Sequence, residues 1–258
     1  MSSSFDQFNS LHHSPDLLVL PNVWNPQSAI RFQENYYPAV ATSSAAVANG
    51  LGYQDGEDMP FSDYFFIIRR ILASVKIPLS VDIEMGYGKS NEAIYKNILQ
   101  LIELGVAGIN IEDSRIQGSE RVLGDADAFA HTIAYIRNGL AAQNEHLFIN
   151  VRCDTFLLNI ENKLQETIRR LALYETSGAD GIFLPFIISE TDIAEVVSHT
   201  KLPLNVMAIP GLPAFDTLQQ LGVKRVSMGP FLFNKVYNSI DSLSSAIKDS
   251  NSFAPILS

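Results

Sequence analysis

Two acidic residues separated by a single position, Asp82 and Glu84, are the first candidates for chemistry in this sequence. They follow an apolar run at residues 77–81 and precede a Gly-Tyr-Gly turn at residues 86–88. Because residues two apart on a strand point to the same face, we expect the two carboxylates side by side at a strand end. Two anions so close repel each other unless a proton or a cation lies between them. A divalent metal with oxygen ligands, most simply Mg2+, is one interpretation; a solvated polar strand end is the other.

Polar residues also follow three other predicted strands. Along the strand ends polar and apolar residues alternate, which indicates that the polar groups face inward and the apolar groups face the helices. Burying charged groups is costly unless they are compensated, and a metal ion near one arginine would restore the balance of charge. The candidate residues at the ends of the second to fifth strands are Ser43, Ser44, Ala45 and Asp55; Asp82 and Glu84; Asn110, Glu112 and Asp113; and Asn150, Arg152 and Asp154.

Eight apolar strands that alternate with helices must position these residues. Three segments, beginning at Gly105, Gly178 and Gly222, repeat a helix-ending glycine, a short turn and a buried strand,. Strands that are apolar throughout predict a parallel sheet covered on both faces. Eight such units predict a single-domain (β/α)8 barrel with its active site at the carboxyl ends of the strands; a doubly wound open sheet is the alternative.

The expected elements divide the chain into three parts. We assign residues 1–16 to an N-terminal arm, residues 17–249 to the barrel and residues 250–258 to a tail. Residues 50–57 are predicted to form a loop, because they contain three glycines. Besides a helix that begins at Pro26 after a capping Asn25, helices are predicted at residues 61–75, 91–104, 125–143, 161–177, 189–200, 213–221 and 231–248.

Composition excludes several classes of function. The 258 residues carry a net charge of −10, which disfavours nucleic acid and anionic membranes as partners. The single cysteine, Cys153, permits no internal disulfide, and neither a signal-peptide pattern nor a membrane-spanning apolar run is present,. We therefore expect a soluble cytoplasmic protein.

Hydrolytic and zinc chemistry are disfavoured by the positions of the histidines. All five lie in the N-terminal segment, on predicted helices or in loops away from the strand ends. No serine has a histidine and an acid in a recognisable pattern, and no zinc-type ligand set is present. A glycine motif that would bind phosphate is also missing.

Several of these motifs together resemble the phosphoenolpyruvate mutase / isocitrate lyase superfamily. The matching segments are residues 21–24, 42–44, 52–55, 81–88, 108–113 and 150–154. The resemblance implies a (β/α)8 barrel, often with a last helix exchanged between subunits, in homodimers or homotetramers. It also implies Mg2+, with Mn2+ as an alternative, and a small carboxylate substrate that is a 2-oxo acid or releases one.

The resemblance further implies roles for individual residues. The metal set would be Asp55, Asp82, Glu84 and Glu112, some acting through water, with Asp55 and Glu112 also catalytic. Ser43, Ser44 and Ala45 would bind the substrate carboxylate and oxyanion, together with Asp82 and Tyr87. Arg152 would clamp the substrate carboxylate and take part in catalysis. A structural ion pair for Arg152 and turn-capping roles for the serines are the alternatives.

Residues 114–124 depart from the superfamily pattern. Lyases of the superfamily carry a mobile gate loop here with a Lys-Lys-Cys-Gly or Lys-Arg-Cys-Gly run, whereas this segment has neither lysine nor cysteine. Arg115, Glu120 and Arg121 are the candidate gate residues. The sequence therefore predicts a Mg2+-dependent carbon–carbon lyase of the decarboxylase or retro-aldol type that acts through an enolate. Phosphonomutase or phosphonopyruvate hydrolase chemistry, and a non-catalytic metal and 2-oxo acid binding protein, are the alternatives.

Overall fold

Nine parallel strands form one closed sheet in the computed structural model, which describes residues 3–257. β1 pairs with β11 and β2 pairs with β3, so the ring closes through the first two strands. Only Pro21 separates β1 from β2, and proline has no N–H to donate to a sheet; its carbonyl still accepts from Ala41 N at 2.9 Å. β1 and β2 thus act as one bent strand, and the predicted eight-unit barrel is confirmed. The strands are β1 (Leu18–Leu20), β2 (Asn22–Val23), β3 (Val40–Thr42), β4 (Leu79–Asp82), β5 (Gly108–Glu112), β8 (Phe148–Arg152), β9 (Gly181–Leu184), β10 (Leu204–Met207) and β11 (Arg225–Ser227).

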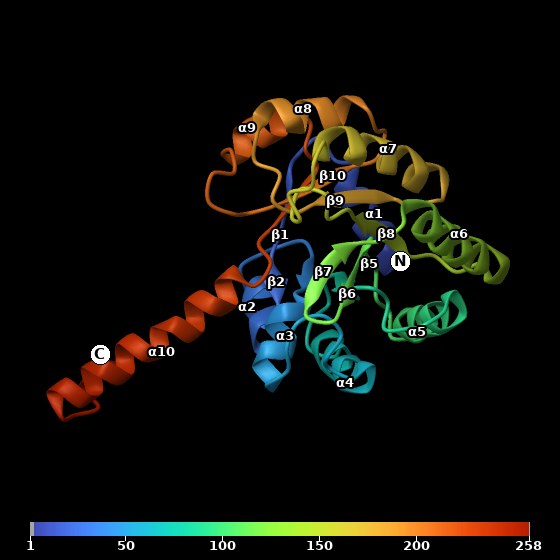
Figure 1. Cartoon of the computed structure of the whole chain (residues 1–258). Coiled ribbons are helices and arrows are strands. Elements are labelled where there is room, and N and C mark those ends of the chain that lie inside the picture. Colours follow the sequence, from blue (N-terminus) through green and yellow to red (C-terminus); the bar gives the residue numbers. More distant parts are fainter. Residues whose placement is uncertain (1–2, 258) are drawn as a thin grey trace.

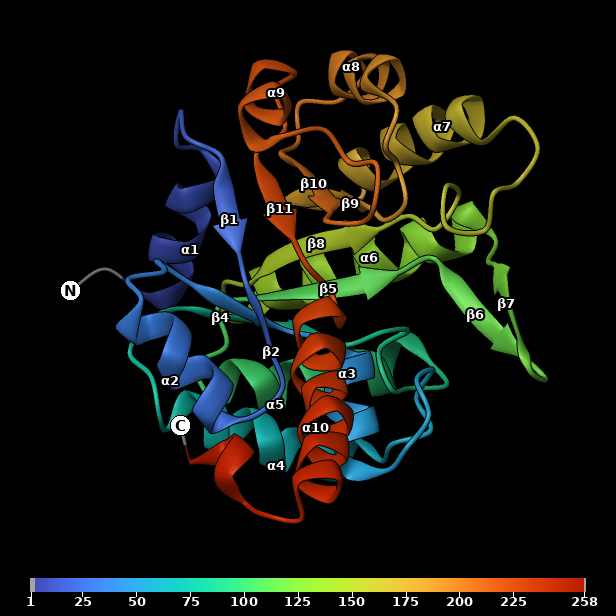
Figure 2. The ribbon, with the colours of Figure 1, turned by 90° about the vertical axis from the view of Figure 1, so that its left-hand side faces the viewer.

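Helices cover the outside of this ring (Figures 1 and 2). Their apolar faces pack on outward-facing strand residues such as Val81, Ile109 and Val226, which are buried in the main core. The helices that follow the strands are α2 (Pro26–Glu34), α3 (Ser44–Leu51), α4 (Phe61–Leu72), α5 (Asn91–Glu103), α6 (Ala126–Gln143), α7 (Lys163–Thr176), α8 (Glu190–Ser198), α9 (Phe215–Gln220) and α10 (Phe231–Ser250).

Capping side chains fix where most of these helices begin. Asn25 and Ser28 form a reciprocal capping box around Pro26 at the start of α2, as the sequence predicts,. α3 is the one barrel helix that the sequence did not predict. Its eight residues are mostly small and have no amphipathic period, but Ser43 caps its first turn and Gly52, at φ 86°, ends it in the left-handed region,.

α1 (Ser4–His12) lies across the amino ends of the strands, where it closes one end of the barrel. Phe8 is fully buried in a cluster with Phe148, and the ring of His12 stacks on Phe148 at a centroid distance of 4.1 Å. A Cβ on Gly108 would lie 2.9 Å from the Phe8 ring, so only glycine fits there. This end of the barrel is therefore filled by side chains.

The two elements outside the regular pattern are a hairpin and the last helix. β6 (Ser114–Gln117) and β7 (Glu120–Leu123) pair antiparallel, so the gate segment forms a short β-hairpin. α10 projects away from the barrel (Figure 1) and exposes apolar side chains that include Val236, Tyr237, Ile240 and Leu243. Beyond it, η1 (Ala254–Ile256) forms a single turn. The predicted boundaries of arm and tail stay predictions, and their residues 1, 2 and 258 lie outside the described residues.

Within residues 3–257, no helix is both long enough and apolar enough to cross a lipid bilayer.

Candidate active site

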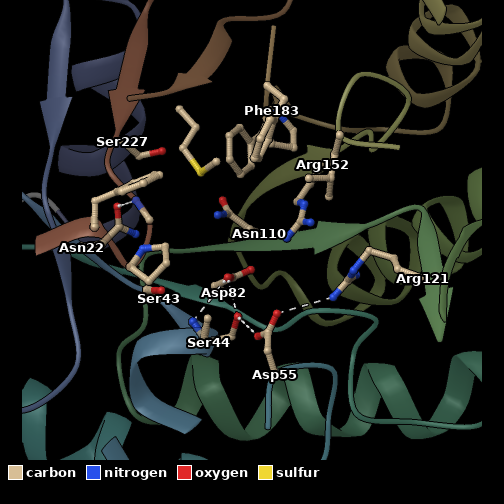
Figure 3. A pocket seen from close by; sticks show the side chains of 18 of the residues that line it. Asn22, Ser43, Ser44, Asp55, Asp82, Asn110, Arg121, Arg152, Phe183 and Ser227 are labelled. Atoms are coloured by element: carbon tan, nitrogen blue, oxygen red, sulfur yellow. Dashed lines mark hydrogen bonds and ion pairs between the residues drawn. The ribbon is translucent and has the colours of Figure 1, made fainter. Parts of the chain in front are cut away.

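A cavity of about 460 Å3 opens at the carboxyl ends of the strands (Figure 3). Its polar wall comes from the ends of β2 to β8, and its apolar wall comes from the loops after β8 to β11. Seven of the predicted strand-end and loop candidates line it: Ser43, Ser44, Ala45, Asp55, Asp82, Asn110 and Arg152. The candidate gate residue Arg121 lines it as well. The rest of the lining is Asn22, Leu157, Leu158, Phe183, Pro185, Phe186, Met207, Ser227, Gly229, Pro230 and Phe231.

Ser44 joins the two acids of the cavity at the start of α3. Its hydroxyl donates to Asp82 Oδ2 at 2.9 Å and lies 3.3 Å from Asp55 Oδ1, and its backbone N–H also points at Asp82 Oδ2, at 3.4 Å. Ser43 instead caps the helix by accepting from Ala46 N at 3.3 Å. Within residues 3–257, all hydrogen bonds to the Asp82 carboxylate come from Ser44 and end on Oδ2.

Burial raises the pKa of Asp82 above its usual value. The Arg152 guanidinium opposes this rise, and the negative charge of Asp55 adds to it. Burial and the nearby Asp55 charge thus disfavour the charged form of the Asp82 carboxylate,.

Glu84 lies outside the cavity lining. β4 ends at Asp82, and Glu84 has a left-handed backbone with φ 51°, so the two carboxylates do not project side by side from one strand as the sequence predicted. The Glu84 carboxylate accepts instead from Glu57 N at 2.9 Å and from Tyr87 Oη at 2.8 Å. Burial, followed by repulsion from Asp55, raises the pKa of Glu84 to about 8.

Glu57 and Tyr87 complete a clasp of three residues with Glu84 behind the cavity. Glu57 Oε1 accepts from Tyr87 N at 2.6 Å, and all three residues have positive φ, between 51° and 64°. Such backbone strain in residues other than glycine is retained only where surrounding contacts enforce it. The clasp fixes the loops after β3 and β4 against each other, and thereby the position of Asp55 and Asp82.

Glu112 is neutralised by two arginines. Arg152 Nη1 lies 2.8 Å from Glu112 Oε2, and Arg121 Nη1 donates to Glu112 Oε1. Arg152 also binds Asp154 through Nε at 2.6 Å and Nη2 at 3.0 Å. Burial disfavours the charge of Arg152, but Asp154 and Asp82 raise its pKa overall. Glu112 itself does not line the cavity; it holds Arg152 and Arg121 there.

The neighbouring acid, Asp113, has a structural role. Its Oδ2 accepts from Tyr174 Oη at 2.7 Å and Arg170 Nη1 at 3.0 Å, both on α7. Its Oδ1 accepts from Asp154 N at 2.9 Å. The two consecutive acids thus have different roles: Glu112 orients the arginines of the cavity, and Asp113 connects β5 to α7.

The hairpin reaches the cavity through Arg121 alone among its side chains. Besides Glu112, Arg121 contacts Ser114 Oγ at 2.8 Å and Asp55 Oδ2 at 3.6 Å. It therefore links the hairpin to Glu112 at the end of β5 and to Asp55 in the loop between α3 and α4. The sequence named Arg121 as a gate residue without an assigned contact, because the pairing of β6 with β7 was not predicted.

Asn22 ties the rim of the cavity together where the ring closes. Its Nδ2 donates to Thr42 O at 2.9 Å, and its Oδ1 accepts from Met228 N and Gly229 N, both at 2.9 Å. One amide side chain therefore joins β2, β3 and the loop after β11.

A family model described as phosphoenolpyruvate phosphomutase matches residues 8–248. The chain belongs to this phosphoenolpyruvate phosphomutase family. The family and its relatives are enzymes, so the cavity at the carboxyl ends of the strands is a candidate active site.

Three proteins illustrate what the chain is similar to. A proposed phosphonomutase from Burkholderia cenocepacia J2315 is 32% identical, with a TM-score of 0.88 over 94% of this chain and 98% of that chain. Oxaloacetate decarboxylase of Ectopseudomonas mendocina is 27% identical over 227 residues, covering 86% of this chain and 77% of the relative. The structure of phosphonopyruvate hydrolase with oxalate and Mg2+ is 20% identical, with a TM-score of 0.87 over 99% of this chain and 90% of that chain, and shares the fold.

The cavity of this phosphoenolpyruvate phosphomutase family member fits Mg2+ in one specific way. Among the described residues, no three His, Cys, Asp or Glu side chains gather into a metal site by themselves. Mg2+, however, is usually bound by one or two carboxylates and otherwise by water and substrate oxygens. Asp82, whose Oδ1 has no hydrogen-bond donor among residues 3–257, and Asp55 fit that requirement. The metal roles of Glu84 and Glu112 stay predictions.

Sequence reasoning missed most of the cavity wall. Asn110 was among the predicted strand-end candidates, whereas Asn22 was named only within the matching segment at residues 21–24. Phe183, Met207 and Ser227 line the cavity from later strands, where apolar and small residues gave no chemical signal. Tyr87, which was expected to bind substrate, lies in the clasp and not in the cavity lining.

Proposed function

We propose that the protein is a Mg2+-dependent lyase that cleaves a carbon–carbon bond next to the 2-oxo group of a small carboxylate. The observation that carries this proposal is the meeting of Asp82, Asp55 and Arg152 in one cavity of about 460 Å3. Asp82 and Asp55 can bind a cation, and Arg152 can bind a carboxylate. The activity of the oxaloacetate decarboxylase relative supports this choice.

Asp82 and Asp55 are the residues that would hold Mg2+, with Glu84 and Glu112 acting only through water. When bound, the cation neutralises negative charge that develops on substrate oxygens during cleavage. Ser44 fixes the two carboxylates relative to each other through its hydroxyl. The Mg2+ and oxalate found in phosphonopyruvate hydrolase support this assignment.

Arg152 is suited to bind the substrate carboxylate. A guanidinium has five N–H groups. Arg152 donates two of them to Asp154, and its Nη1 lies 2.8 Å from Glu112 Oε2. The second N–H of Nη2 and the N–H groups of Nη1 are the ones that can donate to a substrate carboxylate. Glu112 and Asp154 thus orient Arg152 for the substrate.

The cavity favours decarboxylation over reactions that need a positioned acid. Its titratable lining residues are Asp55, Asp82, Arg121 and Arg152, and arginine does not release its proton in proteins. The hairpin supplies Arg121 and contains no cysteine that could act as a proton donor. Loss of CO2 needs stabilisation of negative charge first, and water can then supply the proton.

Incubation of the protein and Mg2+ with oxaloacetate, phosphonopyruvate or 2-methylisocitrate, with pyruvate as the readout, tests the proposal. We expect oxaloacetate to give pyruvate faster with the protein and Mg2+ than with Mg2+ alone. Pyruvate from phosphonopyruvate alone would favour carbon–phosphorus chemistry, the second candidate, which the similarity to the proposed phosphonomutase supports. If no substrate gives pyruvate but oxalate raises the melting temperature only with Mg2+, the non-catalytic binding alternative gains.

For the assembly, we propose a homodimer or homotetramer that exchanges α10 between subunits. α10 leaves the barrel with Val236, Tyr237, Ile240 and Leu243 exposed, an apolar face of the kind that marks an interface. Light scattering should give a multiple of the chain mass, and Ile240→Asp should lower it, whereas Ser239→Asp on the same helix should not. A cytoplasmic location is part of the same proposal, supported by the one buried cysteine, Cys153.

A further inference from the structure

Asn110 lies at the floor of the cavity, at the middle of the polar wall. In the sheet register it pairs with Asp82 on β4 and with Asn150 on β8. Figure 3 shows its amide in the open space between Asp82 and Arg152. Neither the metal nor the clamping arginine of the proposed function uses this residue.

Asn150 and Arg225 fix the orientation of the Asn110 amide. Its Oδ1 accepts from Asn150 Nδ2 at 2.9 Å and lies 3.3 Å from Arg225 Nη2. Because a guanidinium only donates hydrogen bonds, the opposite orientation would place two donors against each other. No described residue accepts a hydrogen bond from Asn110 Nδ2, so this donor is left on the side of the cavity.

Arg225 is an unusual residue for the interior of a barrel. It is 0% exposed, and its Nε and Nη1 have no hydrogen-bond partner among the described residues. None of the described carboxylates forms an ion pair with it. Burial lowers the pKa of Arg225 to about 9, against the more distant attraction of Asp82.

A buried charge without a partner generally lowers stability, and an apolar side chain of similar volume often serves the fold as well or better. A fold requirement therefore does not account for Arg225. Through its hydrogen bond to Asn110 Oδ1, Arg225 leaves the Asn110 N–H donor facing the cavity and places a positive charge close to the cavity floor.

We propose that Asn110 is a substrate-binding residue that donates from Nδ2 to an oxygen of the anionic substrate, and that Arg225 is its positioning residue. Arg225 holds the Asn110 carbonyl downward and adds positive charge beneath the bound anion. This inference rests on the proposed function only in taking the ligand to be a small carboxylate.

Titration of oxalate into the full-length protein saturated with Mg2+, followed by calorimetry, tests this inference. Asn110→Ala and Arg225→Met should each weaken oxalate binding by about 10-fold or more, the effect of one lost hydrogen bond to a charged group. Gln33→Ala removes an amide that accepts from Lys76 N at 2.6 Å outside the cavity lining, and it should leave the oxalate affinity unchanged.

Two further measurements separate a positioning role from a structural one. Arg225→Met should melt at the same temperature as the unaltered protein or higher, although it binds oxalate more weakly. Arg225→Lys, which keeps the charge, should recover part of the affinity. A lower melting temperature with unchanged affinity in Arg225→Met would mean that Arg225 serves the fold alone.

The outcome also distinguishes this inference from the proposed function. If the unaltered protein does not bind oxalate in the presence of Mg2+, the proposed function fails and this inference fails with it. If the unaltered protein binds oxalate and the Asn110 and Arg225 variants bind it equally well, only the inference is overturned.

Discussion

The two ends of the barrel differ in how they are filled. At the amino end, α1 inserts Phe8 and His12 against Phe148, and the interior is closed by aromatic packing. At the carboxyl end, acids, arginines and a serine surround an open cavity, and the loop clasp behind it has strained backbone. The comparison indicates that the amino end contributes to stability through packing, whereas the carboxyl end keeps costly charges for chemistry,.

The largest expected effect is at the amino end. Phe8→Ala should lower the free energy of unfolding by about 3 to 5 kcal/mol, because a fully buried aromatic ring leaves a cavity. Denaturant unfolding measures this loss. Phe66→Ala on α4, where the ring is half exposed, should change stability by less than about 0.5 kcal/mol. Equal losses in the two variants would remove the stated role of the amino end.

At the carboxyl end, Asp82→Ala should have the opposite profile. Pyruvate formation should fall by roughly 100- to 1000-fold, as when a group that stabilises developing charge is removed, and Mg2+ should no longer raise the melting temperature. The folded structure should persist by circular dichroism. Asp216→Ala, an exposed acid on α9, serves as the control. An unchanged Mg2+ response in Asp82→Ala would refute the metal assignment.

His12 should make the stability of the folded protein depend on pH. Burial first, and then the nearby charge of Arg225, lower its pKa from 6.5 to about 3. The folded state therefore favours the neutral imidazole, whereas the unfolded chain takes up a proton below pH 6.5. The free energy of unfolding is therefore unaffected by His12 above pH 6.5 and falls as the pH drops from 6.5 toward 3,. At pH 5 the loss amounts to about 1 to 2 kcal/mol.

His12→Phe should flatten the acid side of the curve of stability against pH, measured by denaturant unfolding between pH 7 and about pH 4. His131→Gln, which replaces an exposed imidazole on α6, should retain the original curve. A curve that is equally steep in His12→Phe would show that other groups control the acid limit.

The smallest effect concerns the clasp. Tyr87→Phe removes the hydroxyl that donates to Glu84 and should lower the free energy of unfolding by about 1 kcal/mol while leaving the oxalate affinity unchanged. Tyr53→Phe, which removes a hydroxyl bonded to Asp63 outside the cavity, is the matched control. A weaker oxalate affinity in Tyr87→Phe alone would mean that this hydroxyl is required by the site, either through the clasp that positions Asp55 and Asp82 or by binding substrate as the sequence predicted.

The barrel could be predicted from the sequence because its strands are buried and read as apolar runs, and because three of them follow a helix-ending glycine, at Gly105, Gly178 and Gly222. α3 could not, since Ser44–Leu51 has no amphipathic period and depends on Ser43 and Gly52 at its ends. Strand parity placed Asp82 and Arg152 correctly in the cavity lining. It failed for Glu84, because the strand ends two residues earlier and the backbone turns to positive φ.

Contacts between distant segments were the other limit. Arg121 neutralises Glu112 only because the hairpin folds back over β5, and no local pattern in the sequence predicts this. Arg225 likewise lies under Asn110 because β11 and β5 face each other across the barrel interior, 115 residues apart in the chain.

Asn22 has a consequence for how the molecule opens. The start and the end of the barrel meet at β1 and β11, and a single amide completes that junction at the rim. A transient separation of β1 from β11 would therefore disrupt one side of the cavity while the remaining strands stayed paired. A bound ligand should in turn slow hydrogen exchange at the amides of Met228 and Gly229, so that occupancy of the site and closure of the ring reinforce each other.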